Sequence, residues 1–123
     1  MKYSSNPKQA DNALLKVTFS FAVDVALYCE KLEERRKWNI ANQLFRSGTS
    51  IGANSREAQN AESRADFIHK LKIALKESEE TEYWLFLCLE LYKDTEIDSL
   101  LTKVNEILRL LNSIISTSKN NLR

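Results

Sequence analysis

The sequence contains few of the residues that form turns. It has two glycines and one proline among 123 residues. A β-sandwich or an α/β domain of this length needs many more turns built on glycine and proline. The composition therefore favours long helices joined by short turns, and the length predicts one domain, residues 1–123, with its own hydrophobic core.

Residues that carry most catalytic and metal chemistry are also scarce. The chain has one histidine, His69, and two cysteines, Cys29 and Cys88. A zinc site needs four protein ligands, or three with a water molecule. Both cysteines lie in apolar helical patterns, so we expect buried free thiols in a reducing cytoplasm. The sequence predicts no enzyme activity, no metal, no cofactor and no small-molecule substrate.

Long apolar runs and a strong net charge are absent as well. No uninterrupted apolar segment is long enough to span a bilayer, and residues 1–10 are polar, so we expect a cytoplasmic protein without a membrane partner. The net charge of +1 argues against a strong polyanion binder as a whole. Charge is nevertheless uneven along the chain, because residues 35–37 are basic and residues 77–82 are mostly acidic.

Apolar residues recur every three or four positions along four segments of the chain. This spacing is typical of amphipathic helices that bury one face. The pattern breaks at residues 33–37 and at Lys93-Asp94-Thr95, and Ser63 followed by Asp66 resembles a capping box at a helix start. The predicted helices cover residues 12–33, 39–61, 64–93 and 96–117.

The four segments and their short connections predict an all-α, antiparallel, up-down-up-down four-helix bundle. The segments contain more apolar positions than one such core needs. A second buried face in a homo-oligomer would account for the excess. The residues outside the main apolar faces include Trp84, Phe86, Leu87, Leu91 and Leu110.

Both glycines fall in the middle of the second predicted helix. Gly48 and Gly52 are four residues apart, whereas a phosphate-binding P-loop needs G-x-x-x-x-G-K-[ST] after a strand. Each glycine inside a helix costs about 1 kcal/mol relative to alanine. We therefore expect a neighbouring group to approach closely at this point, with Phe45 and Trp84 as candidates.

Polar side chains at helical spacing accompany the glycines, and two glutamates follow in the third predicted helix. Di-metal carboxylate bundles use Glu-x-x-His pairs, and this chain has none. We interpret the polar residues as a structural hydrogen-bond network in which Arg46 neutralises a carboxylate. The alternative is an enzyme that uses the carboxylates of Glu57, Glu77 and Glu80. The predicted network comprises Arg46, Ser50, Asn54, Glu57, Glu77 and Glu80.

Basic residues form two groups that the predicted topology places at opposite ends of the bundle. One subunit offers only modest basic patches, but a ring of subunits would multiply each patch and favour binding to a phosphate backbone. No aromatic stacking platform accompanies the basic residues, so base-specific recognition is not expected. The candidate nucleic-acid-binding residues are Arg35, Arg36, Lys37, Arg56, Arg64, Lys70 and Lys72.

Several stretches resemble a known family: residues 12–15, 42–54, 57–59, 66–77 and 80–85. Together they resemble the bacterial four-helix-bundle proteins encoded within intervening sequences of 23S ribosomal RNA genes. That family is similar to the accessory protein of diversity-generating retroelements. The resemblance extends over most of the chain, up to about Leu111.

The resemblance implies a ring-like homopentamer that associates with RNA or DNA and has no known enzymatic reaction. The retroelement relatives bind a reverse transcriptase and nucleic acid, and they look distinctly basic. This chain, with a net charge of +1, departs from that pattern. The alternative function is therefore a protein–protein adaptor or scaffold, such as a retroelement accessory protein that binds a reverse transcriptase.

Overall fold

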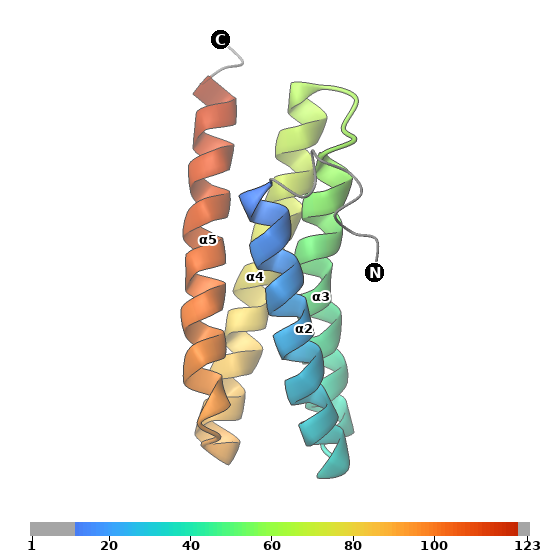
Figure 1. Ribbon diagram of the computed structural model, residues 1–123, viewed down its shortest axis with the longest axis vertical. Coiled ribbons are helices and arrows are strands. Elements are labelled where there is room, and N and C mark those ends of the chain that lie inside the picture. The colour runs from blue at the N-terminus through green and yellow to red at the C-terminus, as the bar shows by residue number, and fades with distance from the viewer. Residues whose placement is uncertain (1–11, 121–123) are drawn as a thin grey trace.

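The computed structural model describes residues 12–120 of the chain, which form four helices and no strand. The helices run alternately down and up the long axis of the molecule (Figure 1). The predicted all-α arrangement is therefore confirmed, and the predicted helix ends differ from the observed ones by at most three residues. The helices are α2 (Ala13–Glu34), α3 (Trp38–Ala58), α4 (Arg64–Tyr92) and α5 (Glu96–Asn120).

Side chains and backbone conformation set the helix ends. Asn12 accepts a hydrogen bond from the backbone N–H of Leu15 at 3.2 Å, and Ser63 accepts one from Asp66 at 3.0 Å. These bonds satisfy backbone donors that have no partner inside the helix. Near the ends of α2 and α4, Arg36 and Lys93 adopt left-handed conformations with φ of 62° and 56°. Glycine usually occupies such positions, and this glycine-poor chain uses cationic residues instead.

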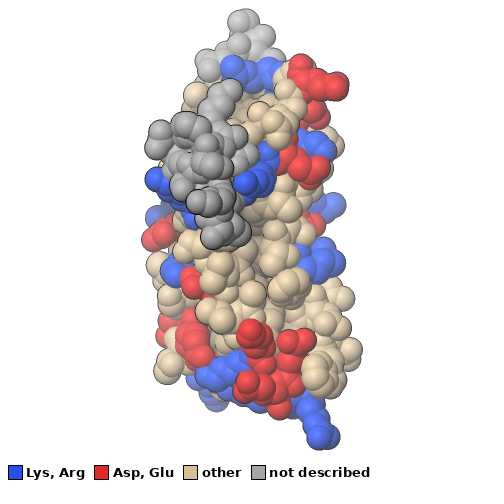
Figure 2. Space-filling view, turned by 45° about the vertical axis from the view of Figure 1, so that its right-hand side comes forward, with Lys and Arg blue, Asp and Glu red and all other residues tan. Residues whose placement is uncertain are grey.

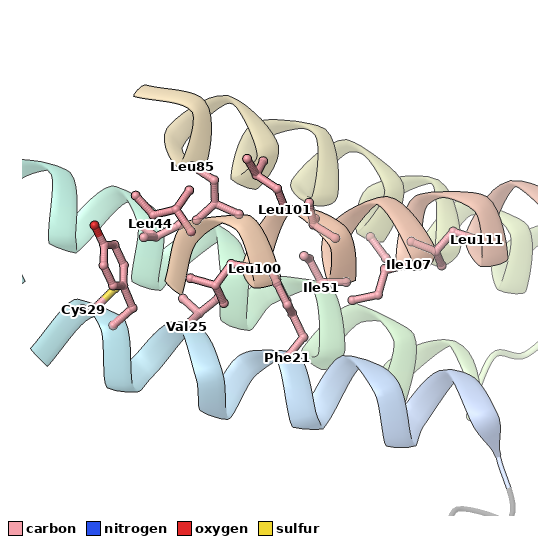
Figure 3. Packing of buried hydrophobic residues seen from close by; sticks show 14 of the residues in the cluster. Phe21, Val25, Cys29, Leu44, Ile51, Leu85, Leu100, Leu101, Ile107 and Leu111 are labelled. Atoms are coloured by element: carbon pink, nitrogen blue, oxygen red, sulfur yellow. The ribbon is translucent and has the colours of Figure 1, made fainter. Parts of the chain in front are cut away.

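One apolar face of each helix forms the core (Figure 3). Phe21, Leu44, Leu71, Leu85 and Ile107 are all fully buried. Helix α2 packs against α3 and α5, and α4 packs against the same two helices. Helices α2 and α4 therefore lie diagonally across the bundle and face solvent on opposite sides.

The two cysteines are buried free thiols on the diagonal helices. Within the described helices, no residue of α2 has its Cα within 8 Å of a residue of α4. Cys29 and Cys88 are thus too far apart for a disulfide without backbone movement. Burial raises the pKa of the Cys29 thiol to about 12 and that of the Cys88 thiol to about 11. Both thiols therefore stay protonated and unreactive at neutral pH.

The close approach at the glycines comes from α2. A Cβ atom on Gly48 would lie 2.8 Å from Cγ1 of Val25, and one on Gly52 would lie 3.4 Å from Oγ1 of Thr18. The prediction of Phe45 and Trp84 as the approaching residues was wrong. Phe45 is half exposed, and Trp84 donates a hydrogen bond to Glu80 on its own helix. Hydrophobic periodicity identified the buried face of α3, but it did not identify the helix opposite.

Candidate nucleic-acid interface

Arg46 joins α3 to α4. Its guanidinium donates to Oε2 of Glu77 at 3.3 Å and also to Glu80. Glu80 accepts a further hydrogen bond from Nε1 of Trp84 at 2.9 Å. Because half of the Arg46 side chain is exposed, solvent screens these charges and the pairing contributes modestly to stability. The geometry is that of a link between two helices.

The other members of the predicted network lie apart from Arg46. Ser50 donates to the carbonyl of Arg46, and Asn54 donates to the carbonyl of Ser50, so both bond to their own helix. Glu57 is 11 residues beyond Arg46, or about 16 Å along α3, and its nearest cation is Lys70 at 4.0 Å. The structure therefore brings together Arg46, Glu77 and Glu80, and it separates Glu57 from the other two carboxylates.

A buried contact between α3 and α4 was missed in the sequence. The hydroxyls of Ser47 and Thr81 form a hydrogen bond of 2.9 Å, and both residues are fully buried. The sequence contained a signal for this contact, because both hydroxyl residues occupy core-facing positions in otherwise apolar helical patterns. Buried polar groups need partners, and this pair fixes the register of the two helices.

One end of the bundle contains the α2–α3 and α4–α5 connections, and we call it the paired end. Both carboxylate oxygens of Asp94 accept hydrogen bonds from Arg35, at 2.7 and 3.0 Å, and the Tyr28 hydroxyl donates to Asp94 at 2.8 Å. The Arg35 guanidinium holds the pKa of Asp94 below its ordinary value. Nearby, Lys31 pairs with Glu96 at 2.6 Å and lowers the pKa of that carboxyl.

Some residues of the first predicted basic group, 35–37, take part in contacts at the paired end. Arg35 is engaged by Asp94, and the ammonium of Lys37 lies 5.8 Å from the ring centroid of Tyr92. Arg36 is exposed in the turn. Of the three cations, therefore, Arg36 alone projects without a contact in the described part of the chain. Figure 2 shows acidic and basic side chains side by side at the lower end of the face that it draws.

The opposite end of the bundle, around the α3–α4 connection, has a different distribution of charged residues, and we call it the basic end. The chain contributes Arg56, Arg64, Lys70 and Lys72 there, as predicted from sequence order. The structure adds Lys119 from the last turn of α5, which the sequence analysis missed. Lys72 and Lys119 are close enough that the charge of Lys72 lowers the pKa of Lys119.

The basic end also contains the carboxylates of Glu57, Glu62 and Asp66. Among residues 12–120, the ion pairs include no carboxylate partner for Arg64, Lys72 or Lys119, and Lys70 approaches Glu57 only to 4.0 Å. Two like charges held together without a carboxylate form a local positive potential that attracts anions. The arrangement can bind phosphate groups through charge without any base-specific contact.

A second surface feature is an apolar stripe on the outside of α2 and α3. Phe19, Val23 and Leu27 are exposed at intervals of four residues on α2. Phe45 is exposed on α3, where it lines a pocket together with Ala26 and Glu30 of α2. We call these four residues the α2–α3 apolar face. The middle of the face drawn in Figure 2 is largely uncharged. Exposed apolar patches of this kind mark interaction surfaces.

The described residues contain neither a candidate metal site nor a candidate membrane-spanning helix. No group of three or more histidine, cysteine, aspartate or glutamate residues there has an arrangement that could hold a metal ion. None of the four helices combines the length and the apolar character that a bilayer span requires. Three surface features of the described chain could contact a partner: the basic end, the α2–α3 apolar face and a groove between α4 and α5.

Comparisons with known proteins agree with this fold. The model of the 23S rRNA-intervening sequence protein family matches residues 10–113. A crystal structure of a protein of unknown function from the S23 ribosomal protein family of Bacteroides thetaiotaomicron is 45% identical, with a TM-score of 0.81. The match covers 84% of this chain and 98% of that one. A search of curated proteins found no match. This chain therefore belongs to the 23S rRNA-intervening sequence protein family.

Proposed function

We propose that this protein is a non-catalytic, homo-oligomeric helical bundle of the cytoplasm that binds the phosphate backbone of RNA or DNA through its basic end. The observation that carries the proposal is the pair Lys72 and Lys119, which lie together without a carboxylate partner in the described chain. The proposed contact residues are Arg56, Arg64, Lys70, Lys72 and Lys119.

Electrostatics favour this surface over the paired end. A phosphate between Lys72 and Lys119 would relieve their mutual repulsion, and binding would release the cations condensed on the nucleic acid. At the paired end, Arg35 and Lys31 already neutralise Asp94 and Glu96. Binding a phosphate there would require breaking those ion pairs, which offsets the gain.

Self-association would strengthen weak binding by one subunit. Covering the α2–α3 apolar face with another copy would remove exposed phenylalanine, valine and leucine from water. A ring of copies with parallel axes would gather their basic ends on one rim, and several weak sites acting together give high avidity. The family resemblance implies five copies. Light scattering should then give about five times the chain mass of 14.2 kDa, and Val23→Lys should reduce it to one chain mass.

The test of nucleic-acid binding compares two double variants with the same change in net charge. Lys72→Glu/Lys119→Glu alters the basic end, and Arg36→Glu/Lys93→Glu alters exposed cations at the paired end. A labelled structured RNA and a DNA duplex of equal length serve as probes at low and high salt. We expect at least a tenfold loss of affinity for the first variant and a smaller salt dependence. We expect less than a threefold loss for the second.

Two outcomes contradict this function. One is no retention of either probe at low salt, where electrostatic binding is strongest. The other is an equal loss for the two variants, because that would show attraction to overall charge and not to the basic end. Circular dichroism on both variants checks that helicity is unchanged.

A protein–protein adaptor, such as a retroelement accessory protein that binds a reverse transcriptase, is the second candidate function. It is favoured by the exposed apolar residues of α4, Tyr83, Phe86 and Leu91, which lie on the side of the bundle away from α2. If Val23→Lys leaves the oligomer unchanged and neither nucleic-acid probe binds, the adaptor function gains support over nucleic-acid binding.

A further inference from the structure

A groove runs along the surface between α4 and α5, in the half of the bundle near the paired end. Its volume is about 520 Å³, and Phe86 of α4 and Leu101 of α5 supply its apolar lining. The Phe86 side chain is 52% exposed, although neighbouring core positions are fully buried. We call this surface the α4–α5 groove. Its residues are Phe86, Asp98, Leu101, Thr102, Asn105, Glu106 and Arg109.

Carboxylates surround Phe86 in this groove. Asp98 and Glu106 line it from α5, and Glu82 and Glu90 lie one helical turn before and after Phe86 on α4. None of these four carboxylates takes part in the ion pairs of residues 12–120. Arg109, at the far end, is the one cation in the lining. The groove thus combines an exposed aromatic anchor with a negatively charged rim.

We propose that the α4–α5 groove binds a basic amphipathic helix of another protein. Two packed helices present a groove into which the side chains of a third helix can insert. The lining extends along α5 from Asp98 to Arg109, which is about 16 Å or three helical turns. Apolar side chains of the bound helix cover the exposed ring of Phe86, and its lysine or arginine residues face the rim carboxylates.

The charge of the rim separates this occupant from the others that an apolar groove could accept. Nucleic acid and anionic lipid are repelled by carboxylates. The apolar stripe of α2 from a second copy is a poor match, because Glu30 and Glu34 follow Leu27 on the exposed side of that helix. Like charges would then meet at the rim. A basic helix is the occupant whose charge complements the groove.

The experiment uses the full chain and two fluorescent 18-residue amphipathic peptides. One contains leucine and lysine, and the other has glutamate at every lysine position. Anisotropy measures the Kd of each peptide. We expect the leucine–lysine peptide to bind and the leucine–glutamate peptide to bind at least tenfold more weakly, because the rim attracts one and repels the other.

Matched variants localise the bound peptide. Phe86→Ser removes the anchor, and Trp38→Ser removes an aromatic side chain of similar exposure, 53%, at the start of α3. Glu82→Lys/Glu106→Lys reverses the rim, and Glu30→Lys/Glu34→Lys makes the same charge change on α2. We expect at least a tenfold rise in Kd for each groove variant and less than a threefold rise for each control. RNA retention should be unchanged in the groove variants.

A nitroxide label on the leucine–lysine peptide supplies a readout that needs no variant. Bound to the wild-type chain, it should broaden amide signals of α4 and α5 residues around the groove. Broadening confined to α2 and α3 overturns the proposal. So does equal binding of the two peptides, absence of binding, or equal loss in groove and control variants. Disassembly of the protein by Phe86→Ser, seen by light scattering, would show that a second copy occupies the groove.

Discussion

The two ends of this bundle carry similar residues but use them differently. At the paired end, Arg35 and Lys31 of α2 form ion pairs with Asp94 and Glu96 beside the α4–α5 connection. At the basic end, Lys72 of α4 and Lys119 of α5 lie together, and neither takes part in an ion pair within residues 12–120. Charge at the first end closes the fold, and charge at the second end does not.

The difference shows why net charge is a poor guide to this protein. The overall value of +1 averages an end where Arg35 and Lys31 form ion pairs with an end where Lys72 and Lys119 lie together. An anion responds to the local potential within about one Debye length, roughly 8–10 Å at physiological salt. Two ends of a long bundle are farther apart than that, so each end acts independently.

The contrast between the two ends assumes that the bundle unfolds in one cooperative transition. Substitutions in the middle of α3 test this assumption. We expect Gly48→Ala to destabilise the whole fold by about 2 kcal/mol, because the added Cβ atom would lie 2.8 Å from Cγ1 of Val25. Gly52→Ala should cost less than about 1 kcal/mol, because its Cβ atom would contact Thr18 at an ordinary distance. Urea unfolding followed by circular dichroism measures both. Equal losses would contradict the packing of α2 on α3 described above.

The paired end should lose stability when its central carboxylate is removed. We expect Asp94→Asn to lower Tm by about 5 °C at pH 7, because Arg35 and Tyr28 lose their charged acceptor. Thermal melts across pH supply the measurement. Glu57→Gln, at the basic end, is the control and should change Tm by less than about 2 °C, because Lys70, its ion-pair partner in the described chain, is 4.0 Å away.

The pH dependence of that effect has a definite sign. Arg35 lowers the pKa of Asp94 in the folded state, so the unfolded chain binds the proton more readily. The stabilisation is therefore complete above the unfolded pKa of about 4 and is lost as pH falls through the lower folded value. Wild type and Asp94→Asn should converge in strong acid. A difference in Tm that stays constant down to pH 2 would contradict the ion pair.

Removing a charge at the basic end should shift Tm in the opposite direction. This is the smallest of the expected changes. We expect Lys72→Gln to leave Tm unchanged or to raise it by up to about 2 °C, because it removes repulsion from Lys119. The gain should vanish in 1 M salt, where exposed charges are screened. At the paired end, Lys31→Gln should instead lower Tm slightly. If Lys72→Gln lowers Tm as well, Lys72 has a structural partner and the contrast between the ends fails.

The sequence predicted the helices well because their signals are local. Ser63 caps α4 with the expected hydrogen bond to Asp66, and the break at Lys93 coincides with a left-handed residue. We also expected Arg46 to neutralise a carboxylate, and it pairs with Glu77 and Glu80 of α4. Helical spacing showed only that these two glutamates share a face of their own helix. Ser50 and Asn54 share a face of α3 with Arg46, yet they bond to carbonyls of their own helix.

Contacts between distant segments were the part that sequence patterns could not supply. Asp94 lies 59 residues from Arg35, and nothing in either neighbourhood indicates the pairing. The glycine contacts with Val25 and Thr18 were likewise assigned to the wrong residues, Phe45 and Trp84. Periodicity reports which face of a helix is buried, and it carries no information on which helix covers that face.

The sequence by itself determined the all-α class, the helix bounds and the buried faces, because backbone hydrogen bonding and amphipathic spacing act within a few residues. Tertiary structure alone decided which cations remain available. A cation is neutralised when folding brings a carboxylate within about 4 Å of it. That distance depends on how four helices align along their whole lengths, and the alignment pairs Arg35 with Asp94 and leaves Lys72 beside Lys119.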